Sequence, residues 1–293
     1  MIIAPHTTTE IRLLLKPQRN KTIAFVPTMG CLHAGHMSLI KKANALADIV
    51  IVSIYENPLQ FGKNEDLDSY PRSFDKDAAL CDQADVDVLF HPATLYPESG
   101  PKITLRATGL CDCLCGASRP GHFDGVLTVV NILFNIIQPD IAVFGEKDWQ
   151  QLTLIRRMVE DLQMPVEIVG GAIIREADGL AMSSRNRYLS EVDRQQALAL
   201  SQALMAMQAS ARNGETHVET LKAVAQDMLD AADIQTEYLD IRCAGSLKHK
   251  QILNQQPTRA FIAARVGNAR LIDNMPLEFN NAPEPATCTE DSR

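Results

Sequence analysis

Short apolar runs alternate with stretches of helical periodicity along the first two thirds of the chain. The runs predicted as strands are Thr22–Pro27, Ile49–Ile54, Val86–Phe90, Ile141–Phe144 and Val166–Val169. Apolar residues at helical spacing lie between or after them, over His36–Ala47, Ser73–Gln83, Val126–Ile137 and Gln150–Leu162. This alternation predicts an α/β fold with a Rossmann-like, doubly wound parallel sheet. Ligands of such sheets bind beyond the carboxyl ends of the strands, so chemistry is expected just after each run.

The pattern changes after about residue 175. Two long helices are predicted, Glu191–Arg212 and Val218–Ala231, and then three strand-like runs, Glu237–Arg242, Arg259–Val266 and Arg270–Ile272. We therefore expect a nucleotide-binding domain over residues 1–175 and a smaller α+β domain over residues 176–280, which would act as a lid. Residues 281–293 are rich in Pro, Thr and acidic side chains and are predicted to be disordered.

Composition narrows the classes of partner. Of 293 residues, 46% are apolar and 22% charged, which is typical of a soluble globular protein. The formal net charge of −8 disfavours nucleic acid, which requires a basic surface. No apolar run reaches the roughly 20 residues of a membrane span, and the N-terminal segment does not resemble a signal peptide. Seven cysteines without disulfide spacing favour reduced thiols and a cytoplasmic location.

The first candidate site follows the first predicted strand, in the sequence PTMGCLHAGH. Gly30 and Gly35 allow a tight turn and close approach to a ligand. His33 and His36 lie at the start of a helix, where free N–H groups and the helix dipole attract phosphate, and imidazoles there can stabilise a departing phosphate. A plain turn with two exposed histidines, or a two-histidine metal pair, explains this motif alone equally well.

The second and third candidate segments are GEKDWQQ and MSSRN. Lys147 supplies a mobile charge for phosphate, Asp148 could bind a ribose hydroxyl, and Gln151 could present an amide to the same cleft. A charged helix start would explain the acidic residues of this segment, but not Lys147. In the third segment, Ser183, Ser184 and Arg185 could bind a polyphosphate, although by itself it could be only a helix N-cap.

Together these segments resemble a known family. A Gly/His loop and a downstream Ser/Arg loop are similar to the HIGH and KMSKS pair of the nucleotidyltransferase superfamily. The motifs PTMGCLHAGH, NPLQF, RPGHFDGV, FGEKDWQQ, ADGLAMSSRN and RLIDN, in this order over residues 20–275, resemble pantothenate synthetases (pantoate–β-alanine ligases).

The resemblance implies an ATP-dependent ligase. It would use Mg²⁺ with the nucleotide, form pantoyl adenylate and pyrophosphate, and then join the pantoyl group to β-alanine with release of AMP. It also implies a homodimer, acting on small molecules and binding neither nucleic acid nor membrane.

The resemblance also implies roles for individual residues. His36 is the implied proton donor, and His33, Lys147, Ser183 and Arg185 complete the implied catalytic set. Gln60 and Gln151 would hold pantoate, and no metal ligands are implied. The implied ATP-binding residues are Met29, Gly30, Cys31, Leu32, His33, Ala34, Gly35, His36, Gly145, Glu146, Lys147, Asp148, Ile174, Met182, Ser183, Ser184 and Arg185.

Four departures from the family pattern lie outside this set. Tyr55-Glu56 replaces the usual Phe-Val, Ile132 a usual Lys, Gly171-Ala172 the usual Val-Pro, and Cys115 a usual Glu. The carboxylate of Glu56 either reshapes the substrate pocket or points to solvent.

The cysteine run invites a zinc hypothesis, with Cys111, Cys113, Cys115 and His122 as ligands. We disfavour it because C-x-C-x-C lacks the usual C-x-x-C spacing and the segment is predicted as a strand, with Asp112 solvated.

Two other functions remain open from the sequence. One is a different adenylate-forming nucleotidyltransferase, which the acidic balance and the paired glutamines disfavour. The other is a non-catalytic relative that binds ATP, which the intact His33, His36, Lys147 and Arg185 disfavour.

Overall fold

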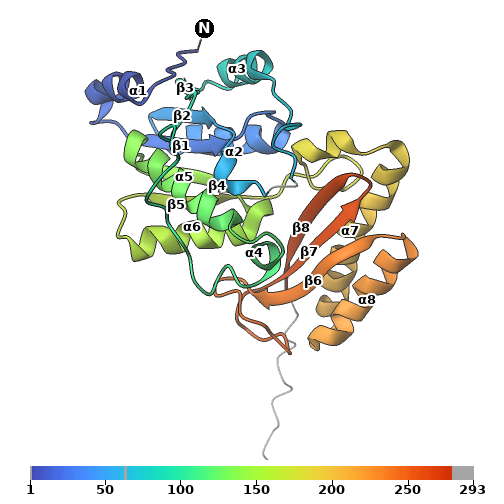
Figure 1. Ribbon diagram of the computed structural model, residues 1–293. Helices are drawn as coiled ribbons and strands as arrows, with labels where there is room; N and C mark the ends of the chain where they lie inside the picture. The colour runs from blue at the N-terminus through green and yellow to red at the C-terminus, as the bar shows by residue number, and fades with distance from the viewer. Residues whose placement is uncertain (1, 63–64, 279–293) are drawn as a thin grey trace, which may run out of the picture.

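The computed structural model describes residues 2–62 and 65–278. Five short strands form a parallel sheet in the order β3-β2-β1-β4-β5 (Figure 1). Their bounds are β1 Ile23–Thr28, β2 Ile49–Ile54, β3 Val88–Phe90, β4 Ile141–Gly145 and β5 Glu167–Gly171. Successive strands are added on one side of β1 as far as β3, and β4 and β5 are then added on its other side, while all five strands stay parallel. This confirms the predicted doubly wound α/β sheet and places the ligand crevice at the ends of β1 and β4.

Helices cover both faces of this sheet. On one face α1, α5 and α6 pack against side chains such as Phe25 and Ile51, and on the other α2 and α3 pack against Val26 and Val52. The helix bounds are α1 Thr8–Leu15, α2 Ala34–Asn44, α3 Phe74–Gln83, α4 Leu114–Ser118, α5 His122–Ile137 and α6 Trp149–Asp161. Alternate residues of β1 and β2 thus face opposite cores, which explains why all of β2 is buried and why every residue of it except Ser53 is apolar.

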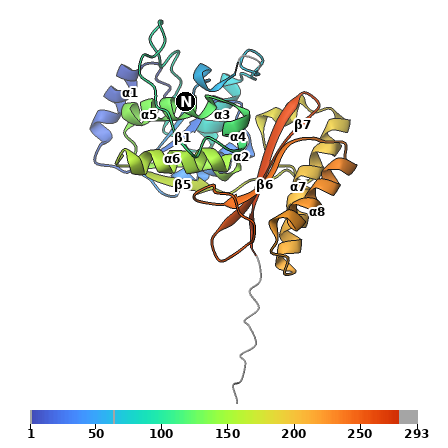
Figure 2. The ribbon, with the colours of Figure 1, turned by 60° about the horizontal axis from the view of Figure 1, so that its bottom comes forward.

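The C-terminal part contains an antiparallel sheet in the order β6-β7-β8, with α7 and α8 packed against it. The elements are α7 Glu191–Arg212, α8 Val218–Ala231, β6 Gln235–Cys243, β7 Thr258–Val266 and β8 Ala269–Leu277. In Figure 2 this C-terminal part lies beside the parallel sheet, and its strands β6–β8 lie between the parallel sheet and the helices α7 and α8. The smaller α+β unit is therefore confirmed, whereas the boundary near residue 175 stays a prediction.

Two local features differ from the sequence prediction. Helix α1, capped by Thr7 and Glu10, was not anticipated. The strand predicted over the cysteine run is wrong, because residues 111–113 turn and α4 begins at Leu114. The chain folds back so tightly that a Cβ on Gly116 would lie 2.1 Å from the carbonyl oxygen of Cys111. An extended segment could not make this contact.

Four short 3₁₀ helices also form within the described residues, and three of them carry predicted site residues. They are η1 Lys16–Gln18, η2 Pro58–Gln60, η3 Glu146–Asp148 and η4 Ser184–Tyr188. Among the helices of the described residues, none is long and apolar enough to cross a membrane. The predicted disordered tail, residues 281–293, lies outside the described residues.

Candidate active site

A buried carboxylate shapes the loop between β1 and α2. Asp77 of α3, only 2% exposed, accepts hydrogen bonds from the backbone N–H groups of Cys31 (2.7 Å) and Leu32 (2.8 Å). The loop reaches this carboxylate through left-handed backbone at Gly30 (φ 81°) and Cys31 (φ 52°). A Cβ at Gly30 would also lie 3.1 Å from the Asp77 carboxylate, so both the backbone conformation and the close contact favour glycine.

Backbone N–H groups fix the tautomers of both loop histidines. The Nδ1 of His33 accepts from the N–H of Gly35 (3.1 Å), and the Nδ1 of His36 accepts from the N–H of His33 (3.4 Å). The two rings lie 4.1 Å apart between centroids. Because an N–H must meet a lone pair, each neutral imidazole carries its proton on Nε2. Both rings therefore remain donors from Nε2.

The same surroundings disfavour protonation of these rings. Burial lowers the pKa of His33 to about 4, assisted by the nearby charges of Lys147 and Arg187. Burial lowers the pKa of His36 to about 3, assisted by His33 and Lys147. Both histidines are thus uncharged hydrogen-bond donors at neutral pH. A polyphosphate would raise both pKa values by adding negative charge beside them.

Strand β4 ends in the turn that carries Lys147. The turn forms η3, and α6 begins directly after it at Trp149. The ammonium of Lys147 makes no hydrogen bond or ion pair with any residue that the structure describes, and its charge faces the two histidines. Asp148 is exposed, and Gln151 lies in the first turn of α6. The turn thus presents one free cation and one amide toward the loop after β1.

Strand β2 leads to η2, which ends at Gln60. Buried Asn57 donates to the Gln60 side chain (3.0 Å) and to the carbonyl of Gly125 on α5 (3.1 Å). A Cβ on Gly125 would lie 2.3 Å from the carbonyl oxygen of Leu59, so only glycine lets α5 approach η2 this closely. The Gln60 amide also donates to the sulfur of Met29 (3.2 Å). These contacts orient Gln60 toward the loop after β1.

The Ser/Arg segment is held by residues between β2 and α3. Arg185 donates twice to Asp66, at 2.8 and 2.9 Å, and lies over the ring of Tyr70. The hydroxyl of Tyr70 lies 3.1 Å from that of Ser184. Ser183 caps η4 through the N–H of Arg185 (3.3 Å). The segment therefore includes the helix cap that the sequence allowed, and it also faces the cavity described next.

One cavity, of about 250 Å³, brings the three segments together. Both implied pantoate residues, Gln60 and Gln151, line it. So do twelve of the implied ATP-binding residues: Met29, His33, Gly35, His36, Gly145, Lys147, Asp148, Ile174, Met182, Ser183, Ser184 and Arg185. The other five do not line it: Gly30, Cys31, Leu32, Ala34 and Glu146. Most of the implied site residues thus line one cavity, and part of the loop after β1 shapes it from outside, while their roles stay predictions.

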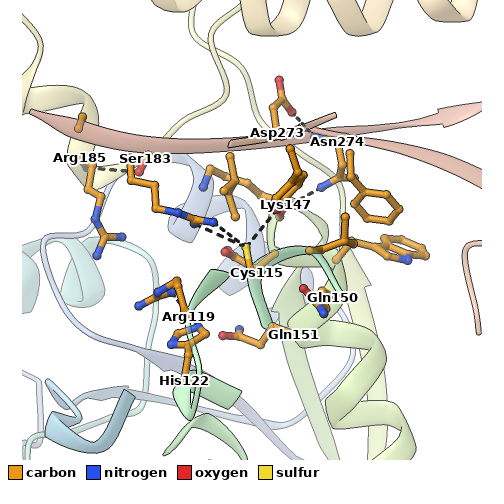
Figure 3. A pocket seen from close by; sticks show the side chains of 18 of the residues that line it. Cys115, Arg119, His122, Lys147, Gln150, Gln151, Ser183, Arg185, Asp273 and Asn274 are labelled. Atoms are coloured by element: carbon orange, nitrogen blue, oxygen red, sulfur yellow. Dashed lines mark hydrogen bonds between the residues drawn. The ribbon is translucent and has the colours of Figure 1, made fainter. Parts of the chain in front are cut away.

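A second cavity of about 200 Å³ continues from the first toward β6–β8. Lys147, Gln151, Ser183 and Arg185 line both cavities, and Figure 3 shows their side chains approaching from both parts of the protein. Cys115, which stands where the family that the sequence resembles usually has Glu, lines this second cavity. Its sulfur lies 3.1 Å from the hydroxyl of Tyr238 and 3.5 Å from both terminal nitrogens of Arg270. Cys115 therefore forms a contact between the two parts of the protein beside the site.

The surroundings of Cys111, Glu56 and Ile132 do not point to a further role in the site. Burial raises the pKa of Cys111 to about 11, which opposes a metal-binding thiolate. Within residues 2–62 and 65–278 no three His, Cys, Asp or Glu side chains are placed to hold a metal. The Glu56 carboxylate pairs with Arg72 (2.7 Å). Ile132 packs against the core under α5.

Sequence reasoning missed several residues that build the site. Arg119 and His122 line both cavities, and Arg119 pairs with Glu65 at 2.5 Å. The Nδ1–H of His122 donates to the carbonyl of Gln60 (2.8 Å), and burial lowers the pKa of His122 to about 4. Both residues lie in the motif RPGHFDGV, for which no role in the nucleotide or pantoate site is predicted from the sequence; His122 enters only as a ligand of the disfavoured zinc hypothesis. Asp66 has no comparable sequence signal.

Comparisons with known proteins agree with one another. A family model described as "Pantoate-beta-alanine ligase" matches residues 4–276. The pantothenate synthetase of Syntrophotalea carbinolica is 48% identical over 276 residues, covering 93% of this chain and 97% of the relative. That of Pseudomonas putida is 48% identical over 279 residues, covering 93% and 96%.

Solved structures show the same similarity. The pantothenate synthetase of Thermus thermophilus superposes with a TM-score of 0.89 at 42% identity, covering 94% of this chain and 99% of that one. The pantoate-β-alanine ligase of Francisella tularensis, solved with "Beta-gamma ATP" and β-alanine, gives 0.79 at 34% identity, covering 94% and 97%.

Proposed function

The chain belongs to the pantoate-β-alanine ligase family, and from that premise we propose that it joins pantoate to β-alanine with consumption of ATP. A carboxylate oxygen of pantoate attacks the α-phosphorus, and the bond to pyrophosphate breaks. The amine of β-alanine then attacks the acyl carbon, and AMP leaves. No protein nucleophile is needed, so positioning and charge stabilisation account for the catalysis.

The observation that supports this proposal is the convergence of cationic and neutral polar groups on one cavity. Lys147 and the Nε2–H groups of His33 and His36 face the same space, where they would bind the phosphates and stabilise the departing pyrophosphate. Gln60 and Gln151 line that space as uncharged amides. Amides suit a substrate with hydroxyls and a carboxylate because they bind it without neutralising the attacking oxygen.

The lining also fits Mg²⁺ that arrives with the nucleotide. Asp148 is the only carboxylate among the described residues of this cavity, which is too few for a resident ion. Bound to phosphate oxygens, Mg²⁺ would neutralise charge on the leaving pyrophosphate. Asp148 would contact the bound metal or the ribose from the lining of this cavity.

Serine and arginine residues complete the proposed nucleotide site. Arg185 faces the cavity while paired with Asp66, so it would bind phosphate only by sharing or exchanging that partner. Ser183 and Ser184 line the cavity beside it. Following the family resemblance, we further propose that the protein is cytoplasmic and forms a homodimer. Light scattering would test the homodimer, for which we expect twice the mass of one chain.

The test is exchange of labelled pyrophosphate into ATP, with Mg²⁺ and without β-alanine. We expect exchange that requires pantoate and falls by about 100-fold or more in Lys147→Ala and His36→Ala, because each removes a donor to the departing phosphate. Lys42→Ala is the matched control, since Lys42 lies on α2 and bonds the carbonyl of Gly170 (2.6 Å) outside the cavity.

Two results would contradict the proposal. One is exchange that proceeds equally well without pantoate. The other is a folded, ATP-binding protein that forms no pantothenate even when β-alanine is added.

A further inference from the structure

A single amide from the C-terminal sheet holds the turn that carries Lys147. Asn274 lies on β8 and is 2% exposed. Its Nδ2 group donates to the carbonyl of Glu146 (3.0 Å) and to the carbonyl of Lys147 (2.8 Å). Both hydrogens of the amide are therefore used on two consecutive peptide groups from the other part of the protein (Figure 3).

The orientation of this amide is fixed by a buried arginine. Arg259 on β7 donates to the Oδ1 of Asn274, which leaves the Nδ2 group facing the two carbonyls. Arg259 is 6% exposed, lies 3.6 Å from the centre of the Trp149 ring and is 3.5 Å from the Glu146 carboxylate. A flipped amide would oppose N–H to N–H and oxygen to oxygen, so the contact has one stable arrangement.

The two carbonyls flank the α-carbon of Lys147. The carbonyl of Glu146 belongs to the peptide group before that carbon, and the carbonyl of Lys147 belongs to the one after it. Holding both peptide groups fixes the direction in which the side chain leaves the backbone. Since the Lys147 ammonium has no hydrogen-bond or ion-pair partner among the described residues, its backbone is what sets its position.

We propose that Asn274 is a positioning residue for catalysis, which holds Lys147 where it can meet the phosphates of ATP. This inference rests on the proposed function, because it assigns Lys147 to phosphate. An error of about 1 Å in a catalytic group costs on the order of 100-fold in rate. The loss of both donors from Asn274 is therefore expected to slow adenylation without unfolding the protein.

Asp273, the residue before Asn274 on β8, supports the Ser/Arg segment in a similar way. Asp273 accepts two hydrogen bonds from Arg175, at 2.6 and 3.1 Å. Arg175 also bonds the carbonyl of Gly179 (3.1 Å), in the hairpin that leads to Met182 and Ser183. Two adjacent residues of one strand thus hold the Lys147 turn and the base of the Ser/Arg segment.

Asn274→Asp is the sharpest test because the two side chains have the same shape. The carboxylate keeps the contact with Arg259 but turns an oxygen toward two carbonyl oxygens. We expect kcat/KM for ATP in pantoate-dependent exchange to fall about 10- to 100-fold, with KM for pantoate within about twofold. Pantoate should be spared because neither implied pantoate residue bonds β8: Gln60 is held by Asn57, and Gln151 is held within helix α6.

A double-mutant cycle with Lys147→Ala separates positioning from general structural damage. If Asn274 acts through Lys147, Asn274→Asp will change the residual exchange of Lys147→Ala by less than about twofold. If the fold-losses of exchange in the two single variants instead multiply in the double variant, the inference is overturned. Should Asn274→Asp not fold, Asn274→Ala removes the same donors without adding a carboxylate and replaces it in the cycle.

Tyr238→Phe provides the matched control. It removes another polar contact between the same two parts, from the Tyr238 hydroxyl to the sulfur of Cys115 (3.1 Å), and leaves Arg259 and the carbonyls beside Lys147 in place. Exchange should stay within about threefold of wild type, and an equal loss in both variants would show that Asn274 only joins the two parts.

Failure of the proposed function gives a different result. In that case the wild-type chain shows no pantoate-dependent exchange, and the same cycle is read from equilibrium binding of ATP. Wild-type exchange that Asn274→Asp leaves unchanged would overturn the inference alone.

Discussion

Replacement of Asp77 by Asn tests whether a carboxylate outside the cavity organises the loop inside it. The carboxylate accepts from the N–H groups of Cys31 and Leu32, and from the hydroxyl of Ser73 (3.2 Å). An asparagine carboxamide has the same shape but only one oxygen. In Asp77→Asn one loop N–H therefore keeps an acceptor, while the other faces an NH₂ group and is left without a partner.

The size of the effect follows from these contacts. A hydrogen bond to a charged group contributes about 1.5–3 kcal/mol, and a buried unpaired N–H costs about 1–3 kcal/mol. We expect Asp77→Asn to lower the free energy of unfolding by about 2–4 kcal/mol, which leaves an ordinary domain folded. If about 1–2 kcal/mol of this must be recovered to order the loop when nucleotide binds, KM for ATP rises roughly 5- to 30-fold.

Urea unfolding at pH 7 and pantoate-dependent pyrophosphate exchange measure the two effects. Asp140→Asn is the matched control, because Asp140 accepts one backbone N–H, that of Ile23 (2.8 Å), at the other end of β1. Its carboxamide can keep that bond, so both stability and KM should change little. Equal behaviour of the two variants, or an unchanged KM for ATP in Asp77→Asn, would refute this account of the loop.

Three further outcomes are expected. Burial lowers the pKa of His36 from about 6.5 to about 3, so between these pH values the unfolded chain binds more protons than the folded one. Wild type should therefore lose about 1–2 kcal/mol more stability than His36→Gln between pH 7 and pH 5 in urea unfolding. Equal losses in the two proteins would contradict this. Gly125→Ala, whose Cβ meets the carbonyl of Leu59, should cost about 1–3 kcal/mol in thermal or urea unfolding and raise KM for pantoate, whereas Gly245→Ala, with open space around it, should do neither. Cys115→Ser should keep exchange within about threefold in the same assay, because a hydroxyl can still meet its polar neighbours; a large loss would show that the sulfur itself is required.

The regular elements could be predicted because their patterns are local. Continuous apolar strands such as Ile49–Ile54 and long amphipathic helices such as Glu191–Arg212 agree with the structure, since burial on both faces or on one stripe leaves a clear period. The cysteine run misled because alternation over five residues also fits a turn followed by a short helix. The close packing of Gly116 on Cys111, which decides between them, is a tertiary contact.

The cavity could be predicted from its motifs, but its supports could not. His36, Lys147 and Gln151 follow strands whose ends meet at one edge of the sheet, so order along the chain was enough to bring them together. Asp77 and Asn274 act from α3 and β8, far away in sequence, and each looks like an ordinary polar residue of its own element. Only the fold shows which backbone groups they bond.

Most backbone N–H groups of the loop after β1 are hydrogen-bonded within the chain, and this affects how the affinity for nucleotide can be altered. In glycine-rich P-loops, successive backbone N–H groups face the phosphates, and no side-chain substitution removes them. In this loop such groups are already bonded within the chain, at Gly30, Cys31, Leu32, His33 and Gly35. We therefore expect recognition of the polyphosphate to fall mainly to side chains. Because a single substitution can remove or replace a side-chain contact, we expect single substitutions to change the affinity of this protein for ATP in separate steps.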